Sequence, residues 1–570
     1  MRSCIWRRKR AIVSAIVLSV AASASAHAEL NESGVLTETI VTDIVDANGN
    51  PANTIEQVSD EAPFDAAEKL TDPVQPVVLE PQEAPAQLAP SPEPIAPSHY
   101  SPSIAASASD APLAYCTCCN STCCTKAKKE AATAAMKSAY GGVFYGNNFG
   151  YLNDKCYDGP TFFGDNLKGL CDGKLDIGGE ARVRYHSENN HRGAGLTGND
   201  DDFWLTRYRM YADYRVNDIF RVYGEYLYAD SGGEVFNNRT IEENRGEMQN
   251  LFLDTRLTDA DTLRLGRQEL LLGNQRLVSP LDWANTRRTF QGARLIHAGK
   301  DWTVDSFFLN PVNRNAANED KIDDANEDVQ FFGAYASRKA NVGTVDAYYL
   351  GLNNDIADFD YHTLGSRVAG SNDRFLYEIE GGVQFGSNSP GFGDHSAGFF
   401  TGGLGKKLSL CCCGEQWNPT VWFWYDWASG GDDVPGNRGD DGFDHLFPLA
   451  HKYLGFMDLF GRRNINDVNF QFITPVLGDK VKLLVWYHHF FLDQATTPYS
   501  VGMNPFSAAA AGDRELGQEI DVLFSIALNP RNSALIGYSH FNAGDYYDTT
   551  GGVPTNADAD FFYFQYQTRF

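Results

Sequence analysis

Hydrophobic and polar residues alternate strictly over the last eleven residues of the chain, from Asp560 to Phe570. One face of this segment would be mostly aromatic and the other mostly polar. The first face comprises Phe562, Phe564, Tyr566, Thr568 and Phe570, and the second comprises Tyr563, Gln565, Gln567 and Arg569. A period of two predicts a β-strand whose two faces meet different environments.

The same alternation recurs from about residue 174 to the C-terminus. We count about eighteen candidate strands, an even number, as single-chain bacterial outer-membrane barrels have. They begin near residues 175, 203, 220, 248, 262, 288, 302, 329, 343, 361, 375, 395, 418, 465, 481, 515, 532 and 560. The last strand, ending on a terminal phenylalanine, resembles the closing strand of such a barrel.

The connections between these strands differ in length by parity. Odd-numbered strands are followed by longer polar stretches, at 187–202, 230–247, 271–287, 311–328, 430–464, 493–514 and 542–558. Even-numbered strands are followed by tight turns such as Asn217-Asp218 and Pro530-Arg531. A soluble β-sandwich has no reason to sort its connections in this way, whereas short periplasmic turns and long outer loops are typical of membrane barrels. We therefore predict an all-β fold, an antiparallel transmembrane β-barrel over 172–570.

The N-terminal sequence predicts export from the cytoplasm, which an outer-membrane barrel requires. A basic region from Arg2 to Arg10, an apolar run from Ala11 to Ala22 and Ala26-His27-Ala28 together predict a signal peptide over 1–28. An anchoring helix is the alternative, but the run is shorter than the roughly 20 apolar residues that span a bilayer. No later stretch is continuously apolar at that length.

Two further regions precede the barrel. Residues 29–115 are rich in Pro, Ala, Glu and Asp, and this composition predicts a disordered periplasmic tether. Residues 116–171 form a cysteine-rich periplasmic segment with a helix expected from Thr125 to Ala139. We predict disulfides here because the periplasm is oxidising, with Cys156–Cys171 as the best single pair. Thiolate ligation of a metal is the alternative, but no histidine stands at ligand spacing.

The formal net charge of −27 suggests a soluble acidic protein only if it is spread evenly. The acids instead gather in the N-terminal region and in turn-like stretches, at 200–202, 319–328 and 432–444. Many aromatics (Tyr 27, Phe 36, Trp 9) and Gly 53 are typical of a barrel with an apolar outside and a polar lumen.

Arginines recur on the polar faces of the first six predicted strands. An arginine on the lipid face costs roughly 2–4 kcal/mol at mid-bilayer, so these faces must look inward. The alternative is that Arg/Glu pairs only brace the barrel wall; the excess of arginine over six neighbouring strands favours a track that attracts anions. The predicted pore-lining, substrate-binding residues are Arg182, Arg184, Arg207, Arg209, Arg215, Arg221, Arg256, Arg264, Arg288 and Arg294.

The run from Leu265 to Leu295, LGRQELLLGNQRLVSPLDWANTRRTFQGARL, resembles the alginate-export family of outer-membrane porins. So do FWLTRYRMYADYRV at 203–216 and HKYLGFMDLFGRRNINDVNF at 451–470. The resemblance covers roughly 172–570. It implies an eighteen-stranded barrel whose arginine-rich constriction passes an acidic uronic-acid polymer outward. The acidic tether and the cysteine-rich segment depart from the simplest family pattern.

No enzyme motif stands out: GxSxG and HExxH are absent, and Ser539 and His540 are adjacent strand residues that point to opposite faces. We expect no cofactor. Ca²⁺ held by acidic outer loops at Asp432-Asp433 and Asp440-Asp441 is an alternative to simply solvated loop tips.

We predict an outer-membrane channel for anionic solutes, with export of an acidic polysaccharide as the specific hypothesis. A general anion-preferring porin, and a plugged barrel acting as an adhesin or envelope tether, are the alternatives. The expected partners are outer-membrane lipid, an anionic polysaccharide or small anions, and a periplasmic or cell-wall partner for the N-terminal extension. Nucleic acid is not expected.

Overall fold

The computed structural model describes residues 126–570, except 192–195, 317–321, 373–374, 392, 413–414, 432–440, 479 and 555–557. The predicted signal peptide, tether and cysteines from Cys116 to Cys124 lie outside the described residues. The chain forms two compact units, one of Met1–Gln75 with Leu410–Trp417, the other of Pro76–Ser409 with Asn418–Phe570. Of the first, the structure describes an antiparallel hairpin of β13 (Leu410–Cys412) and β14 (Glu415–Trp417).

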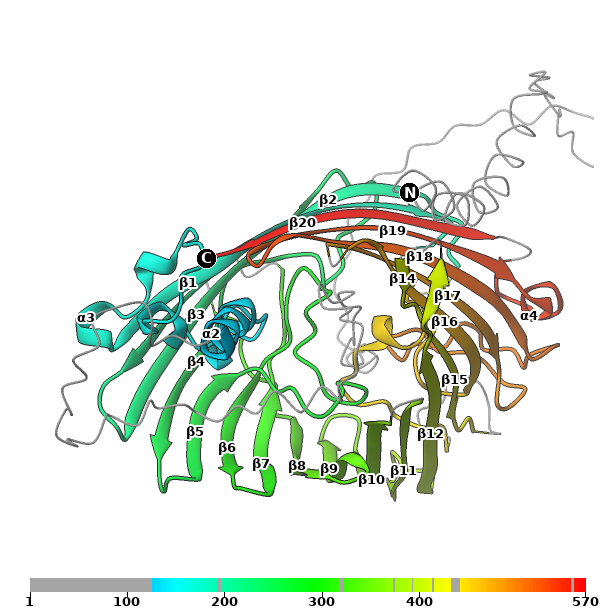
Figure 1. Ribbon diagram of the computed structural model, residues 1–570. Coiled ribbons are helices and arrows are strands. Elements are labelled where there is room, and N and C mark those ends of the chain that lie inside the picture. The colour runs from blue at the N-terminus through cyan, green and yellow to red at the C-terminus, as the bar shows by residue number, and fades with distance from the viewer. Residues whose placement is uncertain are drawn as a thin grey trace, which may run out of the picture. The chain divides into compact units, whose positions relative to one another are not determined.

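The second unit contains one antiparallel sheet of 18 strands (Figure 1). Its strands are β1 (Leu175–Asn189), β2 (Asp201–Arg215), β3 (Phe220–Gly232), β4 (Asn244–Arg256), β5 (Asp261–Gln268), β6 (Phe290–Ala298), β7 (Trp302–Pro311), β8 (Val329–Ala340), β9 (Gly343–Asn354), β10 (Phe359–Ser371), β11 (Leu376–Ser387), β12 (Asp394–Lys407), β15 (Thr420–Ala428), β16 (Ile465–Leu477), β17 (Val481–Phe491), β18 (Glu515–Asn529), β19 (Asn532–Ala543) and β20 (Ala559–Arg569).

The sheet closes on itself. β1 pairs with β2 on one side and with β20 on the other, with Glu180 opposite Arg569 and Asn189 opposite Asp560. Every other strand pairs with its two neighbours in sequence, so no backbone edge is left unpaired. The predicted antiparallel barrel of about eighteen strands is confirmed.

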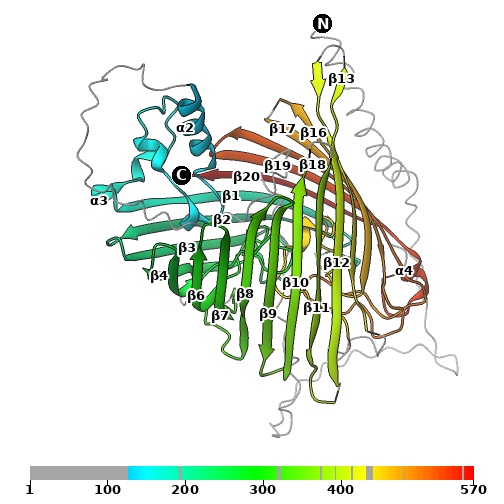
Figure 2. The same ribbon diagram turned by 60° about the horizontal axis from the view of Figure 1, so that its bottom comes forward.

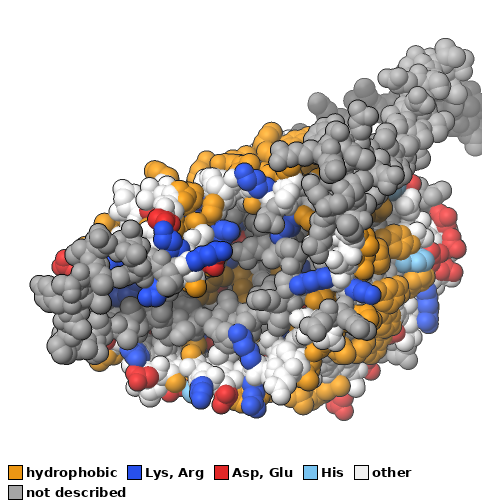
Figure 3. Space-filling model, in the orientation of Figure 1, with side chains coloured by type: hydrophobic (Ala, Val, Ile, Leu, Met, Phe, Trp, Pro, Cys, Tyr) orange, Lys and Arg blue, Asp and Glu red, His pale blue; other side chains and the backbone are white. Residues whose placement is uncertain are grey.

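The alternation that predicted the last strand describes its two faces correctly. Tyr563 is 0% and Gln565 2% exposed, whereas Phe562 is 39% exposed. Exposed aromatic and aliphatic side chains recur on the outer faces of the other strands, and Figure 3 shows patches of hydrophobic side chains along the upper edge and at the lower right of the barrel. An apolar exterior is what a barrel presents to lipid.

The two ends of the barrel differ, and we call them the turn end and the loop end. At the turn end, β2 and β3 are joined by a tight turn in which the Asn217 side-chain carbonyl accepts hydrogen bonds from the backbone N–H groups of Ile219 and Phe220. At the loop end lie the long connections that follow odd-numbered strands, including the short helix α4 (Asp545–Thr549).

Two of the long loops fold back into the barrel and fill it. The β5–β6 loop spans 269–289 and the β15–β16 loop spans 429–464. Leu270 and Trp283 of the first and Phe447 and Phe460 of the second join inward-facing strand residues such as Phe331 in one hydrophobic cluster. Figure 1 shows both loops crossing the space inside the ring of strands.

The chain before β1 lies at the turn end. It contains α2 (Lys126–Ser138), short 3-10 turns at Phe144–Gly146, Gly150–Asn153 and Asp165–Leu167, and α3 (Leu170–Gly173). The helix expected at Thr125–Ala139 is therefore found as α2. The Gly179 N–H donates to the Phe570 carbonyl, and Figure 2 shows α2 and the C-terminus at the same end of the barrel. None of the described helices has the length and apolar character needed to cross a membrane.

The predicted disulfide Cys156–Cys171 is wrong. Cys171 is a free, exposed cysteine, while Cys156 is disulfide-bonded, so its partner is another cysteine. The stretch between them is held by a buried carboxylate instead. Asp165 accepts hydrogen bonds from the hydroxyls of Tyr140 (2.6 Å) and Tyr151 (3.1 Å) and from the Phe162 N–H (2.7 Å). A covalent link between the two ends is not needed to fix this loop.

Candidate functional site

Arginines of β1 and β2 point into the barrel. On β2, Arg207 and Arg209 are both 0% exposed, whereas their neighbours Tyr208 and Met210 are 50% and 55% exposed. Arg182 and Arg184 of β1 are buried in the same way. Because successive side chains of a strand alternate between faces, the aromatic exterior and the arginine-rich interior are two consequences of one pattern.

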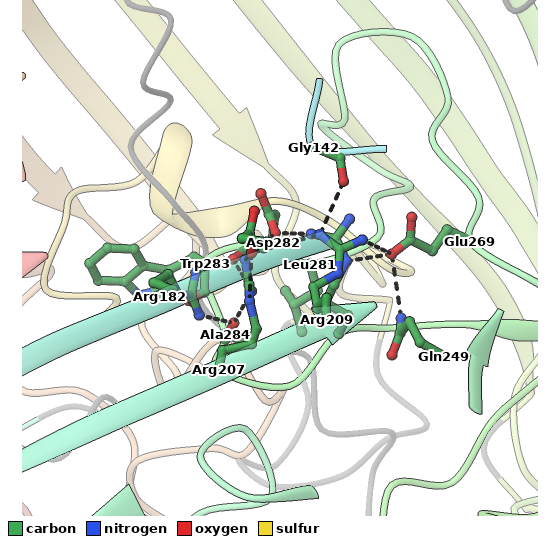
Figure 4. A network of polar contacts seen from close by, with 12 residues as sticks. Gly142, Arg182, Arg207, Arg209, Gln249, Glu269, Leu281, Asp282, Trp283 and Ala284 are labelled. Atoms are coloured by element: carbon green, nitrogen blue, oxygen red, sulfur yellow. Dashed lines mark hydrogen bonds and ion pairs between the residues drawn. The ribbon is translucent and has the colours of Figure 1, made fainter. Parts of the chain in front are cut away.

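Three of these arginines bind the backbone of the β5–β6 loop, and we call Arg182, Arg184 and Arg207 the arginine cradle. Figure 4 shows Arg182 and Arg207 beside the loop residues Asp282, Trp283 and Ala284. Arg182 donates to the carbonyls of Asp282 (2.8 Å) and Ala284 (2.7 Å), and Arg184 donates to that of Trp283 (2.8 Å). Arg207 donates to the Asp282 (3.0 Å) and Ala284 (3.1 Å) carbonyls. The guanidinium groups that were predicted to bind a solute thus bind a loop of the same chain.

These arginines and the neighbouring Arg209 also form ion pairs with carboxylates. Glu180 pairs with Arg207 at 2.6 Å and with Arg569 at 2.9 Å. Arg207 also pairs with the Asp282 carboxylate at 2.8 Å. Arg209 pairs with Glu225 at 2.6 Å and lies 3.8 Å from Glu269, which accepts from Arg287. The result is a continuous network of alternating charge from the wall to the loop, part of which Figure 4 shows.

Most of the remaining predicted arginines lie in similar ion pairs, several of which share a carboxylate. Arg221 bridges Asp213 and Asp254. The others pair as Arg264 with Asp254, Arg294 with Asp305, and Arg215 with Asp176 and Asp213. Arg256 lies at the turn end, where its 27% exposed side chain pairs with the fully exposed Asp259. It is the least enclosed of the set.

Arg288 lies elsewhere than predicted. The sequence placed it at the start of the sixth strand, but β6 begins at Phe290, so Arg288 belongs to the β5–β6 loop. Its guanidinium donates to the Phe447 carbonyl at 2.8 Å and thereby joins the two inward-folded loops. The run of polar residues before Phe290 does not continue the alternation, because these side chains contact loops instead of two faces of a sheet.

Sequence reasoning missed a second group of buried arginines, on the two inward-folded loops, that pair with acids of β11 and β15. Arg276 of the β5–β6 loop pairs with Glu378 (3.2 Å), Glu380 (3.1 Å) and Asp426 (3.1 Å). Arg462 of the β15–β16 loop pairs with the same Asp426 at 2.7 Å. The acidic residues on the inward faces of β11 and β15 could have indicated these arginines, since buried carboxylates require cationic partners.

Acidic residues dominate a third region, on β16 to β18. His488 lies 2.7 Å from Asp467, and Asp521 accepts from the Ser539 hydroxyl. Nearby in the β15–β16 loop, His451 lies 2.7 Å from Asp458; burial raises the pKa of Asp458 well above its usual value and lowers that of His451. Within the described residues no group of three or more His, Cys, Asp or Glu is arranged to hold a metal ion.

The loops pack closely against the arginine wall. An enclosed cavity of about 20 Å³ lies between β1 and the loops, lined among others by Arg184, Glu188, Arg239, Trp283 and Asp458. This volume holds about one water molecule. The site therefore combines a densely charged wall with loops that occupy the space in front of it.

A closed barrel with an apolar outside and a charged inside defines an outer-membrane channel protein. A family model described as "Alginate export" matches residues 173–559, which is most of the chain and nearly the whole barrel. The protein belongs to this alginate export family and is placed in the outer membrane. No curated protein sequence matches it.

Solved structures with a similar fold have low sequence identity to this chain. OpdK of Pseudomonas aeruginosa, crystallised with vanillate, is 12% identical at a TM-score of 0.46, over 69% of this chain and 98% of OpdK. OccK2 of the same organism, in complex with glucuronate, is 12% identical at a TM-score of 0.47, over 69% and 98%. OccAB1 of Acinetobacter baumannii is 14% identical at a TM-score of 0.48, over 72% and 99%.

Proposed function

We propose that this channel passes anionic solutes, and specifically that it exports an acidic polysaccharide of the uronate type through the arginine-lined interior. The observation that carries the proposal is the inward array of Arg182, Arg184, Arg207 and Arg209 on two adjacent strands. Membership of the alginate export family supports an acidic polymer as the substrate.

The mechanism is electrostatic. Guanidinium groups present several N–H donors in a planar fork that matches a carboxylate. In the structure these donors bind carbonyl and carboxylate oxygens of the β5–β6 loop, which are the same atom types that a uronate polymer would offer. Acids interspersed along the wall, such as Glu180 and Glu225, keep each contact weak enough for the polymer to move on.

We further propose that the turn end faces the periplasm, with the N-terminal extension and its cysteines there. The short connections of membrane barrels face the periplasm and the long ones face outward. An oxidising compartment also favours disulfides in the segment that contains Cys156. A protease added to intact cells should leave α2 uncut, and cleavage within α2 would contradict this orientation.

Recording of single channels in a planar bilayer tests the transport proposal. In a KCl gradient the reversal potential should show anion preference, and an oligouronate added to one side should block the current. The matched control is a neutral oligosaccharide of equal length, which should not block. A cation-selective reversal potential that is unaffected by the oligouronate would overturn the proposal.

The filled interior favours a second candidate, a plugged barrel that acts as an adhesin or envelope tether. Leu270, Trp283, Phe447 and Phe460 of the inward-folded loops belong to the largest hydrophobic cluster of the barrel. Absence of any conductance, in every voltage and salt condition and also after the loops are loosened by substitution, would favour this reading over transport.

A further inference from the structure

A short stretch of the chain before β1 enters the barrel at the turn end, and we call residues 139–147 the plug segment. Phe144 and Tyr145 of this segment are 3% and 5% exposed. The Phe144 ring lies 5.0 Å from that of Tyr211, and the Tyr145 ring lies 5.4 Å from that of Phe252. Both strand residues face inward, on β2 and β4. The plug segment is therefore anchored on the inner wall.

The plug segment also occupies inward-facing arginines through its backbone. Arg209 donates to the Gly142 carbonyl (3.1 Å), Arg221 to the Tyr145 carbonyl (2.7 Å) and Arg569 to the Tyr140 carbonyl (3.1 Å). Three carbonyls of one short segment thus meet three arginines, from β2, β3 and β20. Figure 4 shows the contact between Arg209 and Gly142 beside the loop residue Asp282.

Gly142 fits this position because it has no side chain. A Cβ there would lie 3.3 Å from both the Arg569 guanidinium and the Asp282 carboxylate. The backbone can consequently approach the charged network closely enough for its carbonyl to serve as an acceptor. A carbonyl is a neutral acceptor, whereas a carboxylate also carries a negative charge and forms an ion pair with arginine, often through two parallel hydrogen bonds.

A second set of contacts holds the segment from outside the lumen. Arg531, in the turn between β18 and β19, lies 3.2 Å from the centroid of the Tyr140 ring and donates to the Tyr151 hydroxyl at 2.7 Å. Asp165 accepts from both tyrosine hydroxyls. The match to the family model begins only at residue 173, so the plug segment and these anchors precede the part of the chain that defines the family.

We propose that residues 139–147 are a displaceable plug whose backbone carbonyls occupy an entry subsite for carboxylates made of Arg209, Arg221 and Arg569. An incoming polymer replaces the three carbonyls with carboxylates, and the plug leaves the mouth while α2 and its neighbours keep it tethered. The identity of the ligand rests on the proposed function, but the plug itself does not. The exchange is favourable because several arginine–carboxylate ion pairs replace hydrogen bonds to neutral carbonyls.

Channel recordings on the full-length chain test the plug. The double variant F144A/Y145A removes the two aromatic anchors and should raise the fraction of time spent open by roughly tenfold or more. F163A is the matched control, because Phe163 belongs to the same N-terminal segment but is 80% exposed; it should behave as wild type. Circular dichroism verifies that both variants form barrels. Equal open fractions in wild type and F144A/Y145A, or no conductance in either, would overturn the plug.

Hydrogen–deuterium exchange on the detergent-solubilised protein tests the subsite. A uronate hexamer should speed exchange at 139–147 several-fold, and a neutral hexasaccharide should leave it unchanged. The R209K variant retains the charge but not the planar fork, so it should require more hexamer for the same effect. An opened F144A/Y145A channel without anion preference would overturn the proposed function and leave the plug standing. Binding of the hexamer with unchanged exchange at 139–147 would overturn the subsite.

Discussion

At the scale of single residues, the interior of this barrel is unusual in what it buries. Its largest fully buried side chains are arginines and tyrosines, among them Arg182, Arg207, Arg264 and Tyr223. Lipid surrounds the barrel, so the apolar side chains are needed outside and the polar ones collect within. Arg182, Arg207 and Arg264 bind carbonyls or carboxylates, because an unpaired charge in this environment would be costly.

The R207A variant should be strongly destabilised. It leaves Glu180 and Asp282 without the partner that lies 2.6 and 2.8 Å away, and removal of one partner from a buried ion pair costs about 3–5 kcal/mol. The control is R256A, whose exposed pair with Asp259 contributes about 0–1 kcal/mol. Urea unfolding followed by tryptophan fluorescence measures both. Similar losses in the two variants would show that the cradle does not stabilise the barrel.

Lys168 should make stability depend on pH. Burial lowers the pKa of Lys168 to about 8, against the opposing pull of Asp176 and Asp165. Between pH 8 and about 10 the unfolded chain still holds this proton while the folded protein has lost it, so the free energy of unfolding should rise with pH across that window. Below pH 8 both states are protonated and this group contributes no slope.

The comparison of wild type with K168M isolates that effect. The difference in unfolding free energy between the two proteins, measured by urea titration at pH 7, 8, 9 and 10, should change only above pH 8. K137M, at an exposed position of α2, is the control and should follow wild type throughout. A difference between wild type and K168M that stays constant with pH would contradict the expectation.

At the scale of elements, the strands were predictable and the kinks in them were not. Gly266 of β5 lies opposite Gly292 of β6, and both have positive φ angles, 124° and 150°. A Cβ at Gly266 would lie 2.3 Å from the Leu251 carbonyl oxygen, so no other residue fits without a shift of backbone. The kink lies just before the β5–β6 loop leaves the wall and turns inward.

G266A should therefore cost about 1–3 kcal/mol of stability through backbone strain. G232A is the matched control, because at Gly232, near the end of β3, an added Cβ meets nothing within 4 Å; it should be neutral or slightly stabilising. Urea unfolding midpoints of the two variants distinguish them. A neutral G266A would mean that the strand relaxes around the new methyl group.

Prediction of the strands succeeded where one face meets lipid and the other the interior. The alternation in β2 and β20 is strict, because each position has only one compatible environment. It failed at Arg288, where polar residues contact loops, and it could not find Arg276 or Arg462, which are loop residues with no periodic neighbours. The prediction of a Cys156–Cys171 disulfide failed for a related reason, since the spacing of two cysteines along the chain does not fix their distance in space.

At the scale of the whole barrel, the loops decide whether the arginine wall is accessible. Asp282 ties the β5–β6 loop to the wall through Arg207 of β2 at 2.8 Å, and it also pairs with Arg287 of the same loop. The loop thus presents a carboxylate to the wall much as an anionic solute would. A polymer can follow this part of the wall only if the loop moves, because the cavity between the loop and β1 holds about one water molecule.

The D282N variant should raise anion conductance. It keeps the shape of the side chain but removes the negative charge, so the ion pair that ties the loop to Arg207 becomes a weaker hydrogen bond from a cation to a neutral amide. D301N, at an exposed residue between β6 and β7, is the matched control. Planar-bilayer recordings in symmetric KCl compare them. Unchanged conductance in D282N would show that the pair between Asp282 and Arg207 does not close the channel.

The sequence by itself determined the barrel, its strands and the side of each strand that carries arginine. These follow from local alternation, because a strand between lipid and a polar interior leaves little choice at each position. Only the tertiary structure decided what the arginines bind. Carbonyls of 282–284, 142 and 145 reach them from loops and from the segment before β1, which lie far apart in sequence. Such contacts depend on how loops fold into the enclosed space, and no periodic pattern encodes that.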